Sequence, residues 1–319
     1  MTDMSAKPFI SIVVPTMRIG GLDVLVSGLL RQAFKDFELV LVDGVKNSRP
    51  DVFSGRDIPF HVTHVEPIGN PFPVNSFCRY ANTGIVHARG DVVLFLTDYT
   101  WLPPDGVGTH ARFHEAAGGR GLMCPHEYTA LPALSPDFHP YAGSTATRHP
   151  DGVSADAYAH DVFSGATSGF GWTIFARAFS QEDDPRTMPP DSMKGVDPKL
   201  HLPPGPVVPS MFHGKNESCP IDVVLSINGW DEEMDGCHGW QDLDISDRFT
   251  AKTGIQWTLD PSNIAHIVNP RHVFPNGNRL RPYQTNEAMW QAKKAAGFPV
   301  RPNSWDLAEA RAKILAEGM

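Results

Sequence analysis

The sequence predicts an α/β fold with a mixed, mostly parallel sheet flanked by helices. Residues 9–14 (FISIVV) form a continuous apolar, β-branched run, the pattern of a strand buried on both faces, and residues 37–42 (FELVLV) and 91–96 (DVVLFL) are predicted as further strands. Helical patterns at residues 22–33 and 75–88 separate these runs. Strands that alternate with helices in this way form β-α-β units with parallel pairing.

The first two strands each end in a polar turn. FISIVV runs into Pro15 and Thr16, and FELVLV stops at Asp43 and Gly44. Because ligands bind at the carboxyl ends of parallel strands, these residues are expected to border a site. The segment lacks a GxGxxG fingerprint, which disfavours a Rossmann dehydrogenase.

The next elements repeat the pattern. A short strand is predicted around residues 61–65, and the helix of residues 75–88 ends before Gly90. The strand of residues 91–96 breaks at Thr97 and Asp98, and Pro103 and Pro104 open a helix that continues to about residue 117. Three apolar strands therefore end in Thr or Asp, which indicates a site at this edge.

Periodicity fades between residues 118 and 220. A strand is predicted at residues 122–124, a helix at 170–179 and another at 221–227, with long loops at 128–161 and 181–209. Loops of this length in a compact domain are usually lids or insertions. The favoured interpretation of the histidines in this region is surface or loop packing: His126, His139, His149 and His160.

The stretch from residue 227 to 249, INGWDEEMDGCHGWQDLDISDRF, concentrates turn formers, tryptophans and carboxylates. Asn228 and Gly229 predict a turn, and a helix is predicted from Gln241 to a stop at Gly254. Asp242 or Asp244 would cap this helix. Trp240 could also shield Asp242 from water and tune it as a base, and the two interpretations do not exclude each other.

The C-terminal part predicts strands at residues 256–259 and 264–268 and helices at 286–296 and 305–317. The sequence leaves open whether these two helices dock on the preceding residues, on a membrane surface or on a second subunit. No internal repeat appears.

Composition narrows the class of protein. The chain has 319 residues, 41% hydrophobic and 20% charged residues, a formal net charge of -9 and a pI near 5.8. These values argue against a nucleic-acid partner. The four cysteines form no CxxC pair, and the sequence shows no leader pattern and no apolar run of about 20 residues. A cytoplasmic protein is expected.

Three blocks resemble the family-2 glycosyltransferases with the GT-A fold. FISIVVPTMRIGGLDVLVSGLLRQAFKDFELVLVDG is similar to the nucleotide-binding segment, including Gln32 after the first helix. NTGIVHARGDVVLFLTDYTWLPP resembles the segment that carries a metal-binding DxD, and GKNESCPIDVVLSINGWDEEMDGCHGWQDLDISDRF resembles the acceptor-side segment. The blocks cover roughly half the chain in the family's order.

The resemblance implies a GT-A-like catalytic domain over residues 1–270, followed by a helical extension at 271–319. Within the domain, residues 8–117 would form the Rossmann-like nucleotide-binding half and 118–270 the acceptor-side half. The residues it places at the nucleotide are Pro15, Thr16, Arg18, Asp43, Asn75, Arg79, Thr97 and Asp98. Those it places at the donor sugar or acceptor are Lys215, Asn216, Asp231, Trp240 and Gln241.

The metal motif departs from the family pattern. The DxD position reads Thr97, Asp98, Tyr99, so Asp98 is its one carboxylate, and His266 is a candidate second ligand. A divalent cation, Mn²⁺ or Mg²⁺, remains the expected cofactor, since one carboxylate and substrate phosphates can hold it. A packed histidine within a strand is the alternative for His266.

The implied activity is inverting transfer of a sugar from a UDP- or GDP-sugar to a glycan or glycolipid hydroxyl, as in polysaccharide biosynthesis. Asp242 takes the position of the general base, and Gln241 replaces the usual acidic residue before it. The alternatives are a catalytically inactive sugar-nucleotide or glycan-binding module and, less favoured, a nucleotidyltransferase. Peripheral membrane contact and a homo-oligomer both stay open, as do the identities of base, sugar and acceptor.

Overall fold

The structure is a computed structural model that describes residues 7–17, 22–48, 53, 57–69, 76–98, 100–129, 197, 199, 202–237, 239–268, 283–298 and 303–317. Its centre is an eight-stranded sheet in the order β3-β2-β1-β4-β9-β6-β10-β8. The strand bounds are β1 Ile10–Thr16, β2 Phe37–Asp43, β3 His61–Val65, β4 Val92–Phe95, β6 Gly121–Met123, β8 Gly205–Val207, β9 Glu217–Pro220 and β10 Trp257–Leu259.

Most of the sheet is parallel. Strands β1, β2, β3 and β4 pair in parallel, as do β6 and β10, whereas β9 is antiparallel to both β4 and β6, and β8 is antiparallel to β10. The expected mixed, mostly parallel α/β sheet is therefore confirmed. A second sheet has three strands, β5 (Thr100–Trp101), β11 (Ala265–Val268) and β7 (His126–Thr129), in that order.

The two faces of the large sheet bury separate cores. Ile12 and Leu94 face a cluster that includes residues of α1 (Leu22–Leu30) and α3 (Gly106–Ala117). Val13 and Val93 face the opposite way, toward α2 (Phe77–His87), α6 (Ile221–Ser226) and α7 (Gln241–Thr253). Successive residues of a strand point to opposite faces of the sheet. Because both faces of these strands are buried, residues on both faces must be mostly apolar, which explains the continuous apolar runs in the sequence.

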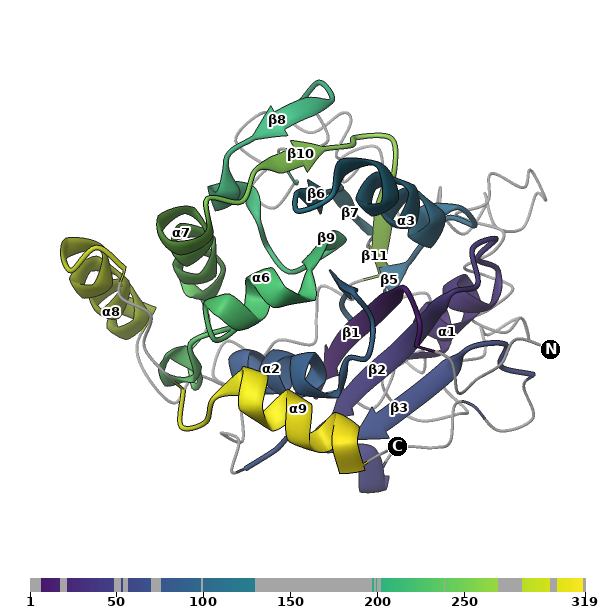
Figure 1. Cartoon of the computed structure of the whole chain (residues 1–319), viewed down its shortest axis with the longest axis horizontal. Helices are drawn as coiled ribbons and strands as arrows, with labels where there is room; N and C mark the ends of the chain where they lie inside the picture. The colour runs from purple at the N-terminus through teal and green to yellow at the C-terminus, as the bar shows by residue number, and fades with distance from the viewer. Residues whose placement is uncertain are drawn as a thin grey trace, which may run out of the picture.

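The C-terminal helices contact both halves of the chain. Helix α9 (Leu307–Glu317) lies beside α2 (Figure 1), and Arg311 Nε donates to the carbonyl of Ala88 at 2.8 Å. Helix α8 (Tyr283–Ala295) packs beside α7, where Trp290 Nε1 donates to Asp247 Oδ2 at 2.9 Å. Of the three possibilities that the sequence leaves open, the structure shows that both helices dock on the preceding residues of the chain.

Four short strands, β5, β7, β8 and β9, lie where the sequence predicts loops or no regular secondary structure. Three short 3-10 helices also appear, η1 (Lys46–Ser48), η4 (Pro209–Met211) and η5 (Glu232–Met234). The short strands carry polar or proline residues and lack an apolar run, so hydropathy does not mark them. The helix predicted at 170–179 lies outside the described residues. Across the described part of the chain, no helix has the length and apolar character that crossing a membrane requires.

Candidate functional site

Thr16, Asp43 and Asp98 come together at the carboxyl ends of three parallel strands. Thr16 pairs with Asp43 in the β1–β2 register, and its hydroxyl donates to Asp98 Oδ2 at 2.7 Å. All three side chains are buried. We call them the strand-end group; Pro15, also predicted at the nucleotide, lies beside Val42 in the same ladder.

Two residues that the sequence did not single out join Asp43. His64, on β3, places Nε2 2.9 Å from Asp43 Oδ2, while the backbone N–H of Val45 donates to Oδ1 at 2.9 Å. Burial, followed by the charge of Asp43, raises the pKa of Tyr80 to about 12. A Cβ on Gly44 would lie 2.0 Å from the Tyr80 hydroxyl oxygen, so the chain needs glycine there. Nothing in the sequence singles out His64, which lies on the partly buried strand β3, or Tyr80, which lies in the inward-facing stripe of α2.

The DxD position, which holds a single carboxylate, offers few ligands for a hard cation. Asp98 is 1% exposed and accepts the Thr16 hydroxyl, and the Thr97 and Thr100 hydroxyl oxygens lie 2.8 Å apart. In the β11–β5 ladder His266 pairs with Trp101; its side chain, Tyr99, Arg18 and Asn75 lie outside what the structure describes. Mg²⁺ and Mn²⁺ prefer several oxygen ligands, so the described residues here fit such an ion poorly.

Arg79 anchors a loop to α2. Its Nη2 lies 2.6 Å from Glu232 Oε2, and Nη1 donates to the carbonyl of Ile68 at 3.1 Å. The backbone N–H groups of Cys78 and Arg79 donate to the carboxylate of Asp235 at 2.9 and 3.0 Å. Asp235 thereby caps the start of α2 from a distant part of the chain, although burial raises its pKa to about 7.

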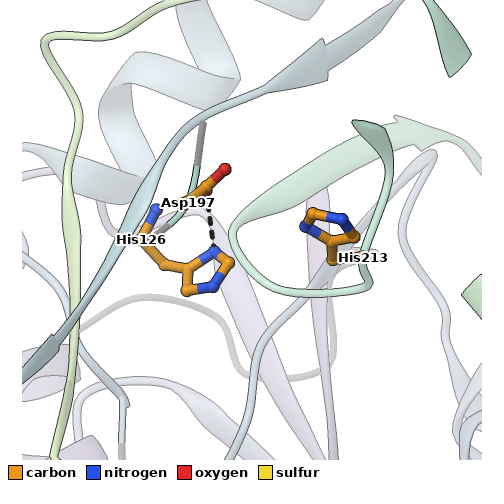
Figure 2. Close-up of side chains that lie close together, drawn as sticks. All are labelled: His126, Asp197 and His213. Atoms are coloured by element: carbon orange, nitrogen blue, oxygen red, sulfur yellow. Dashed lines mark hydrogen bonds and ion pairs between the residues drawn. The ribbon is translucent and has the colours of Figure 1, made fainter. Parts of the chain in front are cut away.

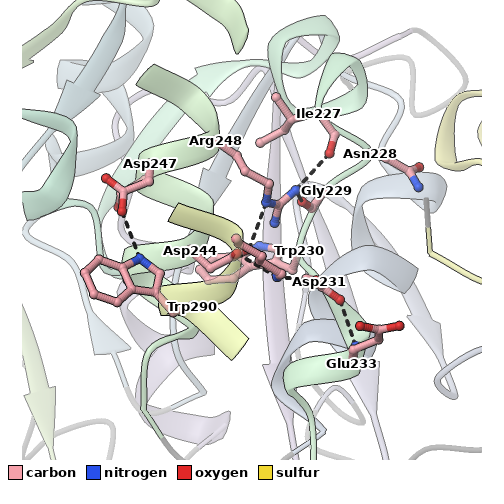
Figure 3. Close-up of polar contacts among 12 residues, drawn as sticks. Ile227, Asn228, Gly229, Trp230, Asp231, Glu233, Asp244, Asp247, Arg248 and Trp290 are labelled. Carbon is pink, nitrogen blue, oxygen red and sulfur yellow. Dashed lines mark hydrogen bonds and ion pairs between the residues drawn. The ribbon is translucent and has the colours of Figure 1, made fainter. Parts of the chain in front are cut away.

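The stretch of residues 227–249 is held by buried charges (Figure 3). Arg248 Nε lies 2.8 Å from Asp244 Oδ2, and Arg248 Nη1 donates to the carbonyls of Ile227 and Gly229 at 2.8 and 2.6 Å. Lys293 of α8 pairs with Asp244 at 2.7 Å and also with Asp231. These contacts fix the turn predicted at Asn228 and Gly229, both of which have positive φ.

The prediction that Asp242 or Asp244 caps α7 is wrong. Trp240 occupies the N-cap position with φ of 72°, and its side chain makes no capping hydrogen bond. The Asp244 carboxylate pairs with Arg248 and Lys293. A tryptophan in the left-handed region is strained, and such strain persists only where the surroundings impose it. Trp240 packs on Trp290 with ring centroids 4.8 Å apart.

Asp242 lies in the first turn of α7 and is half-buried. Burial raises its pKa to about 6, against the opposing charges of Lys215 and Lys199. A carboxylate with this pKa is charged at neutral pH and still basic enough to accept a proton. Asp242 thus combines a partly exposed position in the first turn of α7 with a raised pKa.

The other residues that the resemblance places at the donor or acceptor have defined positions. Gln241 is buried and donates from Nε2 to the carbonyl of Cys237 at 2.5 Å. Asn216 is buried with φ of 64°, and its Nδ2 donates to the carbonyls of Pro125 and Asn263 at 3.0 and 2.8 Å. Asp231 accepts from the N–H of Glu233 at 2.9 Å and pairs with Lys293. These side chains shape the surrounding loops.

A buried ion network lies beside Asp242. Lys199 Nζ contacts Glu217 Oε1, donates to the carbonyl of Met211 at 3.1 Å and lies 3.5 Å from Asp197 Oδ2. The backbone N–H of Lys215 donates to Glu217 Oε2. Burial raises the pKa of Glu217 to about 7 although Lys199 opposes the shift. Because the same two lysines act on Asp242, the network and the candidate base share one electrostatic environment.

Three further side chains, His126, Asp197 and His213, form what we call the histidine cluster (Figure 2). Their candidate ligand atoms all lie within 4.8 Å of one another, and His126 Nδ1 is 2.9 Å from Asp197 Oδ2. Burial lowers the pKa of His126 to about 4 and that of His213 to about 3, so both imidazoles are neutral at pH 7. His126 is 3% exposed in a strand, unlike the surface or loop histidine expected from the sequence.

Comparisons with known proteins support the fold. No protein-family model matches the chain, and no curated protein matches its sequence. The solved structure of S. aureus TarS 1–349 in complex with UDP-GlcNAc is similar at a TM-score of 0.54 and 11% identity, over 97% of this chain and 71% of that one. The structure of S. aureus TarS is similar at a TM-score of 0.51 and 10% identity, over 82% of this chain.

The chain spans 37% of that longer TarS chain, and 60% of TarS 1–349 in a further comparison with a TM-score of 0.48. Identities this low establish the fold alone. The architecture is thus a GT-A-like α/β fold, as the sequence predicted.

Proposed function

We propose that this chain transfers a sugar from a UDP- or GDP-sugar to a saccharide-type hydroxyl, with Asp242 as general base. The observation that carries the proposal is the half-buried Asp242 in the first turn of α7, whose pKa is raised to about 6 by burial. General bases work best with a pKa near the operating pH. The GT-A-like fold and the three sequence blocks supply the reaction class.

In this reaction Asp242 accepts the proton of the acceptor hydroxyl. The acceptor oxygen then forms a bond to the anomeric carbon, while the bond between that carbon and the diphosphate oxygen breaks and the nucleoside diphosphate leaves. Attack opposite the leaving group inverts the anomeric configuration. The ammonium group of Lys215, whose charge acts on Asp242, would offset negative charge on the departing diphosphate.

The nucleoside would bind at the strand-end group. Asp43 can accept hydrogen bonds from a base N–H or a ribose hydroxyl, and Thr16 and Asp98 lie beside it. The bound UDP-GlcNAc of the similar TarS structure supports a nucleotide-sugar donor for a chain of this fold. Lys215 and the partly exposed Trp240 remain our candidates for donor and acceptor contact.

Four predicted contact residues take a positioning role in this proposal: Arg79, Asn216, Asp231 and Gln241. Their side chains hold backbone carbonyls or buried charges near the site. Replacing them would displace Asp242 or its loop, and would lower activity without removing a group that touches substrate.

The test is a donor screen with the purified chain, followed by Asp242→Asn on the preferred donor. We expect turnover to fall by about 10²- to 10⁴-fold with the donor dissociation constant little changed. Asp222→Asn is the matched control, because Asp222 is an exposed aspartate near the start of the neighbouring helix α6. Its activity should equal that of the wild type.

The rival function is a sugar-nucleotide or glycan-binding module without catalysis, which the poor ligand set around Asp98 favours. Titration with UDP and GDP, each with and without Mn²⁺, separates the two readings when combined with donor hydrolysis. Nucleotide binding without turnover, equal in wild type and Asp242→Asn, would establish the binding module and exclude the transferase.

A further inference from the structure

The histidine cluster is assembled from three separate segments. His126 lies on β7, Asp197 lies 71 residues later, and His213 lies in the loop between η4 and β9. The ring centroids of His126 and His213 are 6.0 Å apart and the planes meet at 83°. In Figure 2 the His126 ring and the Asp197 carboxylate lie together, with His213 facing them from the neighbouring loop. Within the described residues, this is the one group of three potential ligands so close together.

The backbone around the cluster fixes these side chains. The N–H of His126 donates to Asp197 Oδ2 at 3.0 Å, and the N–H of Lys199 donates to Asp197 Oδ1 at 3.1 Å. His213 is held between Phe212, which is fully buried, and Gly214, whose φ is 65°. A Cβ at Gly214 would lie 3.1 Å from the Trp230 ring. Ligands whose positions are fixed before an ion arrives lose little entropy when it binds.

The donor set has a specific chemistry. Two imidazoles and one carboxylate suit first-row transition metals such as Zn²⁺, and three protein ligands leave a coordination position open. The DxD position offers a hard cation much less, since Asp98 is its one carboxylate. The fold's usual cation position and the best described ligand set are therefore different places in this chain.

The charges around the cluster indicate what would fill the open position. Asp197 lies 3.5 Å from Lys199 Nζ, and Lys199 also contacts Glu217. Lys215 follows His213 by two residues in the sequence. The carboxylates of Asp197 and Glu217 are therefore already matched by the ammonium groups of Lys199 and Lys215. A divalent cation adds positive charge, so an anionic ligand on the ion would restore the balance.

We propose that His126, Asp197 and His213 bind a divalent first-row transition-metal ion together with a phosphate oxygen. The ion is bound by the three side chains, and the phosphate takes the position they leave open. Assigning that phosphate to the donor's diphosphate rests on the proposed function; the metal site itself does not.

The experiment uses the full chain, freed of metal by a chelator and then dialysed against Zn²⁺ or Mn²⁺. Metal analysis should find about one Zn²⁺ per chain, with Mn²⁺ bound more weakly in keeping with the usual affinity order. Inorganic phosphate, titrated calorimetrically, should bind at least about five-fold more tightly to the Zn²⁺-loaded chain than to the metal-free chain.

Variants locate the site. His126→Gln and His213→Gln should each weaken Zn²⁺ binding by more than about 100-fold, since the loss of even a group that only supports a ligand costs 10- to 100-fold. His87→Gln, in the last turn of α2, is the control and should bind as the wild type does. Circular dichroism confirms that each variant is folded, and a misfolded variant is replaced by the corresponding Asn substitution.

Zn²⁺ stoichiometry that is unchanged in a folded variant carrying both His126→Gln and His213→Gln, or no Zn²⁺ bound by the folded wild type, would overturn the proposal. Equal phosphate affinity with and without Zn²⁺ would overturn its anionic part. Both readouts are independent of sugar transfer. Metal binding without transfer would therefore reject the proposed function alone, and transfer without metal binding would reject the metal site alone.

Discussion

The hydroxyl of Thr16 donates to Oδ2 of Asp98 at 2.7 Å and joins the carboxyl end of β1 to the residues that follow β4. Both side chains are buried, so the bond lies in a medium of low dielectric constant. It holds the remaining carboxylate of the DxD position against the proposed nucleoside site.

Thr16→Val tests this bond, because valine keeps the shape and removes the hydroxyl. We expect a loss of about 1–3 kcal/mol in the free energy of unfolding, since the bond goes to a buried carboxylate. Urea titration measures it, with Thr258→Val on β10 as a control at a partly exposed strand position. An equal loss in both variants would show that the Asp98 contact contributes nothing special.

The pH dependence of transfer should follow Asp242. The base works when deprotonated, and burial raises its pKa to about 6. The rate under low-donor conditions should therefore fall tenfold per pH unit below about pH 6 and level off above it. A profile measured from pH 4.5 to 8 checks this. A rate that stays nearly level down to pH 4.5, as a base with the ordinary aspartate pKa of 3.8 would give, would contradict the raised pKa.

Asp242 should also reduce stability at neutral pH. Its folded pKa lies above the unfolded value, so the folded state favours the protonated form, and stability is lost as pH rises from about 4 through 6. Asp242→Asn should therefore stabilise the chain at pH 7, by on the order of 1 kcal/mol after allowance for the partial exposure of the carboxylate.

That stability gain should disappear below about pH 4, where both states of Asp242 are protonated. Urea unfolding of wild type and variant at pH 4 and pH 7 gives the comparison. A variant that is less stable than the wild type at pH 7 would show that the charged carboxylate of Asp242 stabilises the fold, and would contradict the inference that its burial is unfavourable.

Lys293→Met should destabilise the docking of α8. Lys293 is 1% exposed and contacts Asp231 and Asp244, so its loss leaves two buried carboxylates with one less cation. Breaking a buried pair on one side costs about 3 kcal/mol or more. Lys294→Met is the matched control, because its neighbour Lys294 is exposed over the Trp290 ring.

Urea unfolding of both variants measures the difference, and Asp244→Asn in the Lys293→Met background should recover part of the loss. Arg248 stays close to Asp244 in each case. Equal unfolding free energies for Lys293→Met and Lys294→Met would exclude an energetic role for the buried network.

The sequence was informative where burial and periodicity coincide. Strands β1, β2 and β4 are buried on both faces, so their side chains are almost all apolar and their positions could be predicted closely. Strand β9 is equally central but carries Glu217 and Ser218. Their partners, Lys199 for the first and His110 and His114 for the second, come from other segments. Hydropathy does not register such a strand.

The candidate site divides in the same way. Thr16, Asp43 and Asp98 follow recognisable strands, so topology alone predicts that they meet. The histidine cluster depends on β7 pairing with β11 and on the path of the chain to Asp197, neither of which leaves a local pattern. The misassigned cap at α7 has a similar cause in part, because Lys293 reaches Asp244 from α8, whereas Arg248 pairs with it from the next turn of α7.

The place of β9 in the sheet sets the order in which the protein can form. It lies between β4 and β6 and pairs antiparallel with both. Its first residue, Glu217, pairs with Phe95 at the end of β4, although 121 residues lie between the two in the sequence. During synthesis, β4 and β6 therefore have unpaired edges until residues 217–220 emerge from the ribosome. A nascent chain that stops before residue 217 exposes the unpaired edges of two central strands, and such edges favour aggregation.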